Sequence, residues 1–223
     1  MINTIVDKVF VITTLNSNRV DYIRNHLNET GINFDFFVSP ETKIITDSII
    51  VQDGGDVYDK NHKASISLIS SFVSIVEISK ISNFEKICII EDDCYFDTGW
   101  KDSLTHFYNN LPNDWDLINL GYHPLHDSDS IKEKINDFVY KPLNYHHTTH
   151  CMIVKNTCFD EYINMNNKFK YTIPVDYVFN EIYKNSSYKS FYPVEKFVYQ
   201  LSVRKNTYNV PNINLRFNSL VIK

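Results

Sequence analysis

Apolar and polar residues follow one another in blocks along the chain, and the spacing within each block separates strands from helices. Short, nearly continuous apolar runs predict buried strands at about 9–12, 33–38, 86–90, 116–120 and 149–154. Apolar residues at helical spacing predict helices at about 19–30, 61–81, 100–110, 157–165 and 174–183. Strand, helix and strand at this spacing indicate a βαβ unit. We therefore expect an α/β fold with a mostly parallel central sheet flanked by helices.

Two stretches show neither pattern. Residues 39–60 contain Pro40, Gly54-Gly55 and several acids and are predicted to be an irregular or weakly stranded loop, and residues 123–147, with Pro124 and Pro142, are polar and predicted to be irregular. The tail after Ser190 is rich in Tyr and Asn, and we expect it to be extended and to pack back on the domain. No internal repeat and no linker interrupts the 223 residues. The prediction is a single domain over residues 1–223.

The composition narrows the function classes. Hydrophobic residues make up 43% and charged residues 22%, which is typical of a globular chain. The chain has only five glycines, with no GxGxxG and no GK[ST], so glycine-rich phosphate loops are excluded. A net charge of -5 without an extended basic patch argues against nucleic acid as a partner. A small anionic ligand stays open, because a metal ion supplies positive charge locally.

Cysteine usage and the N-terminus bear on the compartment. None of the four cysteines forms a CxxC pair, and we interpret them as reduced structural thiols. The apolar run within residues 1–14 is too short for a signal peptide or a membrane span. We expect no membrane span and a cytoplasmic protein, in the host cytoplasm if the source is a virus.

Three adjacent carboxylates, Glu91-Asp92-Asp93, come directly after the buried run at 86–90. Side by side they repel one another, which destabilises the fold or raises a pKa unless a cation offsets their charge. In open α/β sheets ligands bind outside the carboxyl ends of the strands, where this triplet falls. Carboxylate oxygens completed by substrate phosphates suit Mg²⁺ or Mn²⁺. The triplet predicts a divalent metal site, and the alternative is a solvated turn in which an aspartate caps a turn or helix.

A series of segments in collinear order resembles glycosyltransferase family 25, which includes bacterial lipooligosaccharide galactosyltransferases and procollagen galactosyltransferases. Residues 89–93 are similar to the family's L-I-L-E-D-D signature, and residues 115–121 to its W-D-I-I-x-L-G. The other similar segments are the first strand with its arginine-containing loop (9–19), a G-I-x-F-x-F-F segment (31–37), a T-H-A-Y-x-I strand (149–154), a P-x-D motif (174–176) and the ending (192–202). Residues 67–72 depart from the family pattern. The family has a glycine-cysteine pair and a Ser-His there, and this chain has Ser-Leu-Ile-Ser-Ser-Phe.

The resemblance implies a GT-A-like fold and an inverting transferase that uses a UDP-sugar with Mn²⁺ (or Mg²⁺). It implies transfer of a hexose, with galactose favoured and glucose second, to a glycan or hydroxylated protein acceptor. The acceptor and the oligomeric state stay open. One alternative is a non-catalytic module of the same fold that binds sugar nucleotides. The other is a metal-dependent phosphoryl-transfer enzyme, which usually draws carboxylates from several strands.

The resemblance also assigns roles to residues. Asp93 is predicted to be the main metal ligand, and Glu91 and Asp92 to bind the metal, the ribose or the sugar. His150 is predicted to complete the metal site or to contact a phosphate. Asp176 is the candidate base that deprotonates the acceptor hydroxyl, with a helix N-cap as its alternative. His150 has a second interpretation as a hydrogen-bonded core residue.

Further candidates surround this centre. Thr13 and Arg19, at the end of the first strand, are predicted to contact uracil or phosphate, with a surface salt bridge as the alternative for Arg19. Gln200, with Ser202 and Arg204, is a candidate to close over sugar or acceptor. Two other groups are interpreted mainly as core or loop residues: Tyr95, Phe96 and Trp100, which follow the triplet, and the adjacent pair His146 and His147.

Overall fold

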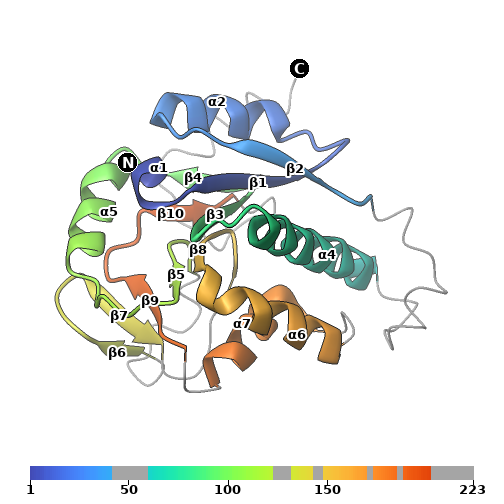
Figure 1. Ribbon diagram of the computed structural model, residues 1–223. Helices are drawn as coiled ribbons and strands as arrows, with labels where there is room; N and C mark the ends of the chain where they lie inside the picture. The colour runs from blue at the N-terminus through green and yellow to red at the C-terminus, as the bar shows by residue number, and fades with distance from the viewer. Residues whose placement is uncertain (42–59, 123–131, 143–147, 170–172, 185–187, 202–223) are drawn as a thin grey trace.

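The computed structural model describes residues 1–41, 60–122, 132–142, 148–169, 173–184 and 188–201 (Figure 1). Within these ranges the strands are β1 (Lys8–Thr14), β2 (Asp35–Ser39), β3 (Lys86–Glu91), β4 (Cys94–Phe96), β5 (Leu117–Asn119), β6 (Lys132–Lys134), β7 (Val139–Pro142), β8 (Cys151–Lys155), β9 (Ser190–Pro193) and β10 (Val198–Gln200). The helices are α1 (Ile2–Ile5), α2 (Val20–Thr30), α4 (Lys60–Ile81), α5 (Trp100–Asn109), the 3₁₀ turn η3 (Asn156–Cys158), α6 (Phe159–Phe169) and α7 (Val175–Lys184).

Eight strands form one mixed sheet in the order β2-β1-β3-β8-β5-β9-β7-β6. β1 pairs in parallel with both β2 and β3, and β5 pairs in parallel with β9. β8 is inserted between β3 and β5 and runs antiparallel to both, and β7 runs antiparallel to its neighbours β9 and β6. All strands of this sheet except β7 and β8 therefore point the same way, and the predicted α/β fold with a central sheet flanked by helices is confirmed. The sheet is mixed, because the two reversed strands make four of its neighbouring pairs antiparallel.

The first βαβ unit shows how local sequence sets the fold. β1 buries five consecutive residues between two neighbouring strands, as its apolar run predicts. α2 buries Ile23 and Leu27 on one face and ends at Gly31, which has a φ of 74°. This left-handed conformation favours glycine and lets its N–H reach the carbonyls at the helix end. The chain then returns as β2 beside β1, in the predicted parallel arrangement.

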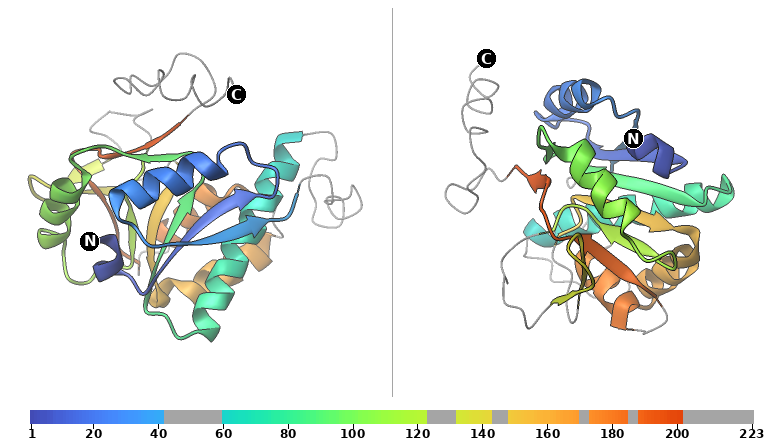
Figure 2. Two further views of the ribbon diagram at one scale, coloured as in Figure 1. Left: turned by 90° about the horizontal axis from the view of Figure 1, so that it is seen from above. Right: turned by 90° about the vertical axis from the view of Figure 1, so that its left-hand side faces the viewer.

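Helices cover both faces of the sheet (Figures 1 and 2). One apolar core lies under α1, α2 and α5 and contains Ile23, Leu27 and Phe107. The other lies under α4, α6 and α7 and contains Phe72 and Phe179. Three layers result, with the sheet in the middle, so that its strand ends on one edge remain open for a site.

Several elements differ from the sequence prediction. α6 begins after a 3₁₀ turn and reaches Phe169, four residues beyond the expected end. Residues 132–134 and 139–142, expected to be irregular, form the hairpin β6–β7 because their backbones pair with each other and with β9. The expected extended tail is present up to Gln200 as β9 and β10, and β10 pairs with β4. Residues 42–59, 123–131 and 143–147 of the predicted loops, and the residues after 201, lie outside the described residues.

α4 is the most apolar helix. Its segment Lys63–Ile81 is long and apolar enough to cross a bilayer by length and composition alone, but half of that window is buried in the molecule. Ile69, Phe72 and Val76 are fully covered by the second core. A buried core helix of a folded domain meets the same length and composition test, and its contacts give α4 that role.

The segment that departs from the resembled family, residues 67–72, has a structural role on α4. The Ser67 hydroxyl donates to the carbonyl of Pro40 at 2.5 Å, and the hydroxyls of Ser39 and Ser71 are hydrogen-bonded at 2.7 Å. Ser39 and Ser71 are both buried. These bonds fasten α4 to the end of β2.

The four cysteines are free and buried, as the interpretation as reduced structural thiols requires. Burial raises the pKa of the Cys94 thiol, and the pKa of the Cys151 thiol is raised chiefly by the same cause. A raised pKa keeps these groups as unreactive thiols.

Candidate functional site

The candidate site lies where β3 ends. Glu91 is the last residue of β3, Asp92 and Asp93 form the turn, and β4 begins at Cys94. β1 and β5 run parallel to β3, so their carboxyl ends reach the same edge of the sheet. β8 runs the opposite way, so the residues that precede it, Thr149 and His150, arrive at this edge too. The fold thus gathers the ends of several strands around the acidic triplet.

Asp92 is buried and fully engaged by the loop that follows β1. Its Oδ2 accepts hydrogen bonds from the hydroxyls of Thr13 at 2.7 Å and Ser17 at 2.6 Å. Its Oδ1 accepts from Nε and Nη2 of Arg19, both at 2.7 Å. Three predicted ligand-binding residues, Thr13, Arg19 and Asp92, are therefore brought together and bind one another. Arg19 remains about one-third exposed, so part of its guanidinium still faces solvent.

Asp93 is the carboxylate of the triplet with open coordination. Its Oδ2 accepts a hydrogen bond from Nε2 of Gln200 at 3.1 Å, and its backbone carbonyl accepts from the N–H of Leu201. Its Oδ1 is buried and has no hydrogen-bond partner among the residues that the structure describes. Burial raises the pKa of Asp93 to about 6, against the opposing effect of Arg19. A buried oxygen without a partner is costly unless something binds it, which marks Oδ1 as a ligand position.

Glu91 faces the same place from the end of β3. Its Oε1 accepts a hydrogen bond from the Thr149 hydroxyl at 2.8 Å. Burial, together with the carboxylates of Asp93, Asp92 and Asp176, raises the pKa of Glu91 to about 8, against the opposing effect of the Thr149 hydrogen bond. The sequence predicted a shifted pKa in the triplet from repulsion between like charges. The structure shows that burial is the larger cause of the shift at Glu91. A bound cation would reverse this shift by stabilising the charged form.

His150 packs against Gly121, the second residue after β5. The imidazole is buried, and a Cβ added to Gly121 would lie 2.2 Å from its Nε2. The carbonyl of His150 accepts the N–H of Glu91 at 2.9 Å, so its backbone is fixed to the triplet. His150 is therefore a buried residue next to the triplet. This position is compatible with both interpretations, a ligand and a core histidine.

Asp176 lies in the first turn of α7. The helix begins at Val175, so Asp176 is inside the helix, and the predicted alternative of an N-cap is wrong. Its Oδ1 accepts the N–H of Tyr177 at 3.1 Å. Burial raises the pKa of Asp176, and its charge contributes to the raised pKa of Glu91. The charge of the candidate base therefore acts on the carboxylate of Glu91.

The remaining candidates fall into three groups. Phe96 and Trp100 are buried in the first core and have the packing role, and Tyr95 stacks on His26 with ring centroids 4.8 Å apart. Gln200, predicted to close over a substrate, instead orients Asp93. His146, His147, Ser202 and Arg204 lie outside the described residues.

Three site residues were missed by sequence reasoning. Ser17 and Thr149 donate to Asp92 and Glu91, and Gly121 supplies the space for His150. Ser17 and Thr149 carry no signal as single hydroxyl residues, although both adjoin predicted site residues. Gly121 did carry a signal, since it is one of only five glycines and directly follows a predicted strand.

The donor set fits a hard divalent cation that shares its coordination with a substrate. Within the described part of the chain, no three His, Cys, Asp or Glu side chains form a complete metal cluster. Asp93 Oδ1 and the carboxylate of Glu91 are hard oxygen donors of the type that Mg²⁺ and Mn²⁺ prefer. Such ions are commonly held by one or two carboxylates, with substrate phosphates and water completing the shell.

The raised pKa values predict an unusual pH dependence of stability when metal is absent. Folding raises the pKa of Glu91 from 4.5 to about 8 and that of Asp93 from 3.8 to about 6. Between these values the folded state retains protons that the unfolded state has released, so the free energy of unfolding falls as pH rises. In EDTA, the Tm of the unaltered protein should fall between pH 5 and pH 8, and we expect Glu91→Gln to make this fall smaller by about 3 °C or more. This corresponds to about 1 kcal/mol in the free energy of unfolding.

Thermal melts across this pH range test the prediction, with Glu29→Gln on α2 as the matched exposed control. An equal slope of Tm against pH in Glu91→Gln and the unaltered protein would contradict it.

Comparison with known proteins gives structural neighbours but no sequence relatives. No family model and no curated protein matches the chain. A solved glycosyltransferase involved in the glycosylation of the major capsid of PBCV-1 matches with a TM-score of 0.50 and 11% identity, over 83% of this chain and 81% of that one.

Two further solved structures match less well. The inositol-1-phosphate CTP transferase from T. maritima matches with a TM-score of 0.47 and 12% identity, over 96% of this chain and 94% of that one. Mouse xyloside xylosyltransferase 1 matches with a TM-score of 0.42 and 10% identity, over 82% and 83%. The match at a TM-score of 0.50 shows that the chain has a mixed α/β, GT-A-like fold.

Proposed function

We propose that this protein is a metal-dependent inverting glycosyltransferase that moves a hexose from a UDP-sugar to an acceptor hydroxyl. The observation that carries the proposal is Asp93 Oδ1, a buried oxygen without a hydrogen-bond partner at the open edge of a GT-A-like fold. Galactose is the favoured hexose and glucose the second, as the resemblance to glycosyltransferase family 25 implies. The acceptor class is a glycan or a hydroxylated protein.

Asp93 and Glu91 would hold Mn²⁺ or Mg²⁺, with His150 as a further candidate ligand. The bound ion would supply positive charge that offsets the negative charge developing on the departing UDP. Gln200 fixes Oδ2 of Asp93, which leaves Oδ1 directed to the ligand. Asp92 orients Arg19, whose exposed part is available to a phosphate or to uracil.

Asp176 is proposed as the base. It would accept the proton of the acceptor hydroxyl as that oxygen attacks the anomeric carbon and the bond to the UDP oxygen breaks. Burial raises the pKa of this carboxyl toward the working pH, which improves a general base. Its position in the first turn of α7 holds it on a rigid element.

A non-catalytic sugar-nucleotide module remains the second candidate, since the same pocket chemistry would bind without turnover. A phosphoryl-transfer enzyme with two metals is less well supported. Such sites gather carboxylates from several strands, and the described residues concentrate theirs at the end of β3, with Asp176 on α7.

The test is a thermal-shift panel of UDP, UDP-galactose and UDP-glucose, each with and without Mn²⁺. We expect a rise of about 5–10 °C at saturating UDP-sugar with Mn²⁺, because about 2.7 kcal/mol is gained at a hundred times Kd. ADP-glucose, which carries adenine in place of uracil, serves as the control for recognition of the nucleobase. If Mn²⁺ makes no difference to UDP affinity, the proposal is wrong, and binding without any sugar-nucleotide hydrolysis would favour the non-catalytic module.

A further inference from the structure

A separate cavity opens at the other end of β3. Its volume is about 460 Å³, within the range of small-molecule pockets. β3 begins at Lys86 and ends at Glu91, so a rise of about 3.3 Å per residue puts the two strand ends about 16 Å apart. The cavity is lined from α5 and the chain after it, from the start of β3 and from the end of β8: Glu85, Lys86, Tyr108, Leu111, Pro112, Asn113, Trp115, Lys155 and Asn156. None of these residues belongs to the site described above.

Two lysines face each other in this cavity. Lys86 and Lys155 are directly opposite in the antiparallel ladder of β3 and β8. Like charges at opposite positions of a sheet are unfavourable by roughly 0.2–1 kcal/mol. Burial lowers the pKa of Lys155, and Lys86 adds to this shift, whereas the carboxylates of Asp116 and Asp114 oppose it without reaching salt-bridge distance. The pair therefore weakens the sheet unless a negative charge lies between the two ammonium groups.

The protein does not supply that charge through an ion pair. Among the described residues, neither Lys86 nor Lys155 has a carboxylate within salt-bridge distance, whereas Lys189 pairs with Asp114. The nearby carboxylates have other partners. Asp7 accepts the N–H groups of Glu85 and Lys86, and Asp116 accepts the Thr157 hydroxyl at 2.7 Å and the N–H of Lys189 at 2.8 Å. Glu85 is the one carboxylate in the lining, and it is exposed.

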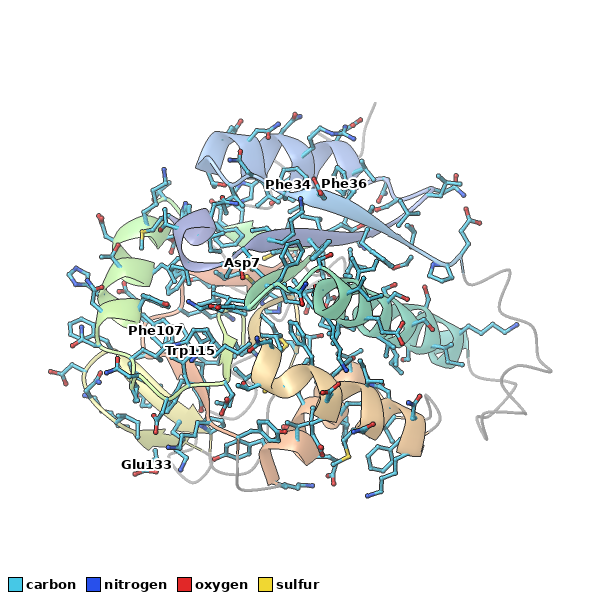
Figure 3. The ribbon with its side chains drawn as sticks, viewed as in Figure 1. Asp7, Phe34, Phe36, Phe107, Trp115 and Glu133 are labelled. Atoms are coloured by element: carbon cyan, nitrogen blue, oxygen red, sulfur yellow. The ribbon has the colours of Figure 1, made fainter. Side chains whose placement is uncertain are left out.

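Aromatic rings hold one of the lysines in place. Nζ of Lys155 lies 4.1 Å from the centroid of the Trp115 ring, a cation–π contact, and Trp115 is nearly buried between α5 and the sheet (Figure 3). Tyr108 meets Trp115 edge-on with centroids 6.4 Å apart. Leu111 and Pro112 extend this apolar wall.

We propose that this cavity is a second binding site, for a small phosphate monoester that carries an apolar or ring-shaped group. The phosphate would lie between the ammonium groups of Lys86 and Lys155, and the organic part would pack on Tyr108, Leu111 and Pro112. A phosphate dianion matches two cations better than a singly charged carboxylate does. The amides of Asn113 and Asn156 add hydrogen-bond donors at the rim. The inference stands independently of the proposed transferase activity.

Binding of phenyl phosphate, with inorganic phosphate in parallel, tests the site. The titration is followed by NMR in EDTA, without nucleotide and at fixed ionic strength. We expect saturable shifts of the Trp115 indole N–H and of the backbone amides at 85–86 and 155–156. Phenyl phosphate should bind more tightly than inorganic phosphate, because only it uses the apolar wall. The double variant Lys86→Gln/Lys155→Gln should weaken binding at least about tenfold, and Glu85→Gln should tighten it.

Matched variants separate this site from other sources of binding. Lys80→Gln removes a lysine that is paired with Asp160 on the surface and should leave affinity unchanged. Asp93→Asn should also leave it unchanged, so failure of the transferase proposal and failure of this one are distinguishable. The inference is overturned if the shifts are absent, or if they do not saturate. It is equally overturned if Lys80→Gln weakens binding as much as the double variant, or if the shifts instead surround Asp93.

Discussion

Asp93→Asn is expected to lower Mn²⁺-dependent turnover of a UDP-sugar by roughly 10²–10³-fold, the loss typical of removing one main electrostatic group from an active site. The substitution is nearly isosteric, and the Asn oxygen can still accept from Nε2 of Gln200. What disappears is the negative charge at Oδ1, the buried atom without a partner. Slow hydrolysis of UDP-galactose measures the effect without knowledge of the acceptor.

The fold should survive this change. Burial raises the pKa of Asp93 to about 6, so the ionised form is held in the apo protein at a cost that a neutral amide avoids. The apo Tm at pH 8 should therefore be unchanged or higher, which separates lost chemistry from lost structure. Asp137→Asn, on an exposed carboxylate paired with Lys134 at 2.8 Å, is the matched control and should retain full activity. Turnover by Asp93→Asn within threefold of the unaltered protein would contradict the assignment.

Much of the fold was predictable because its signals are local. The apolar runs predicted β1, β3 and β5, and helical periodicity predicted α2, α4 and α5, since each pattern reflects burial of one element. The position of the triplet at a strand end was predictable for the same reason. The short strands β4 and β6 were missed, because three residues carry no periodicity and their pairing depends on distant partners.

The direction of β8 was the most important fact that periodicity does not encode. An apolar strand reads the same in either direction, so residues 149–154 predicted a strand without an orientation. Because β8 runs antiparallel to β3, Thr149 and His150 lie at its starting end beside Glu91. A parallel β8 would have carried them to the opposite edge of the sheet. The meeting of this strand start with the acidic triplet is a property of topology.

The different contacts of the three carboxylates likewise could not be predicted from the sequence. Before the structure, Asp93 was already the preferred metal ligand, but only the coordinates show that Asp92 binds Thr13, Ser17 and Arg19, whereas Asp93 keeps one oxygen without a partner among the described residues. Residues far along the chain make this difference. Gln200, more than one hundred positions later, reaches Asp93 because β10 pairs with β4.

Gly121→Ala is expected to destabilise the protein by roughly 1–3 kcal/mol, the usual range for a side chain forced into filled space. The added Cβ would lie 2.2 Å from Nε2 and 2.3 Å from Cδ2 of His150, far inside contact distance. His150 is 1% exposed, so the imidazole has no open space beside it into which to move. A chain of this size should lose about 3–10 °C in Tm, measured by differential scanning calorimetry.

The same clash tests whether Gly121 positions the His150 imidazole for ligand binding. Gly99→Ala is the matched control, because its nearest contact would be an Asp97 oxygen at 3.8 Å, and it should leave Tm unchanged. In the double variant Gly121→Ala/His150→Ala the clash is removed, so its loss of stability should be smaller than the sum of the two single losses. If the losses simply add, the two side chains do not compete for one space and the packing described for this edge of the site is wrong. If stability recovers while Mn²⁺-dependent UDP binding does not, the imidazole acts on the ligand, and Gly121 is a positioning residue for it.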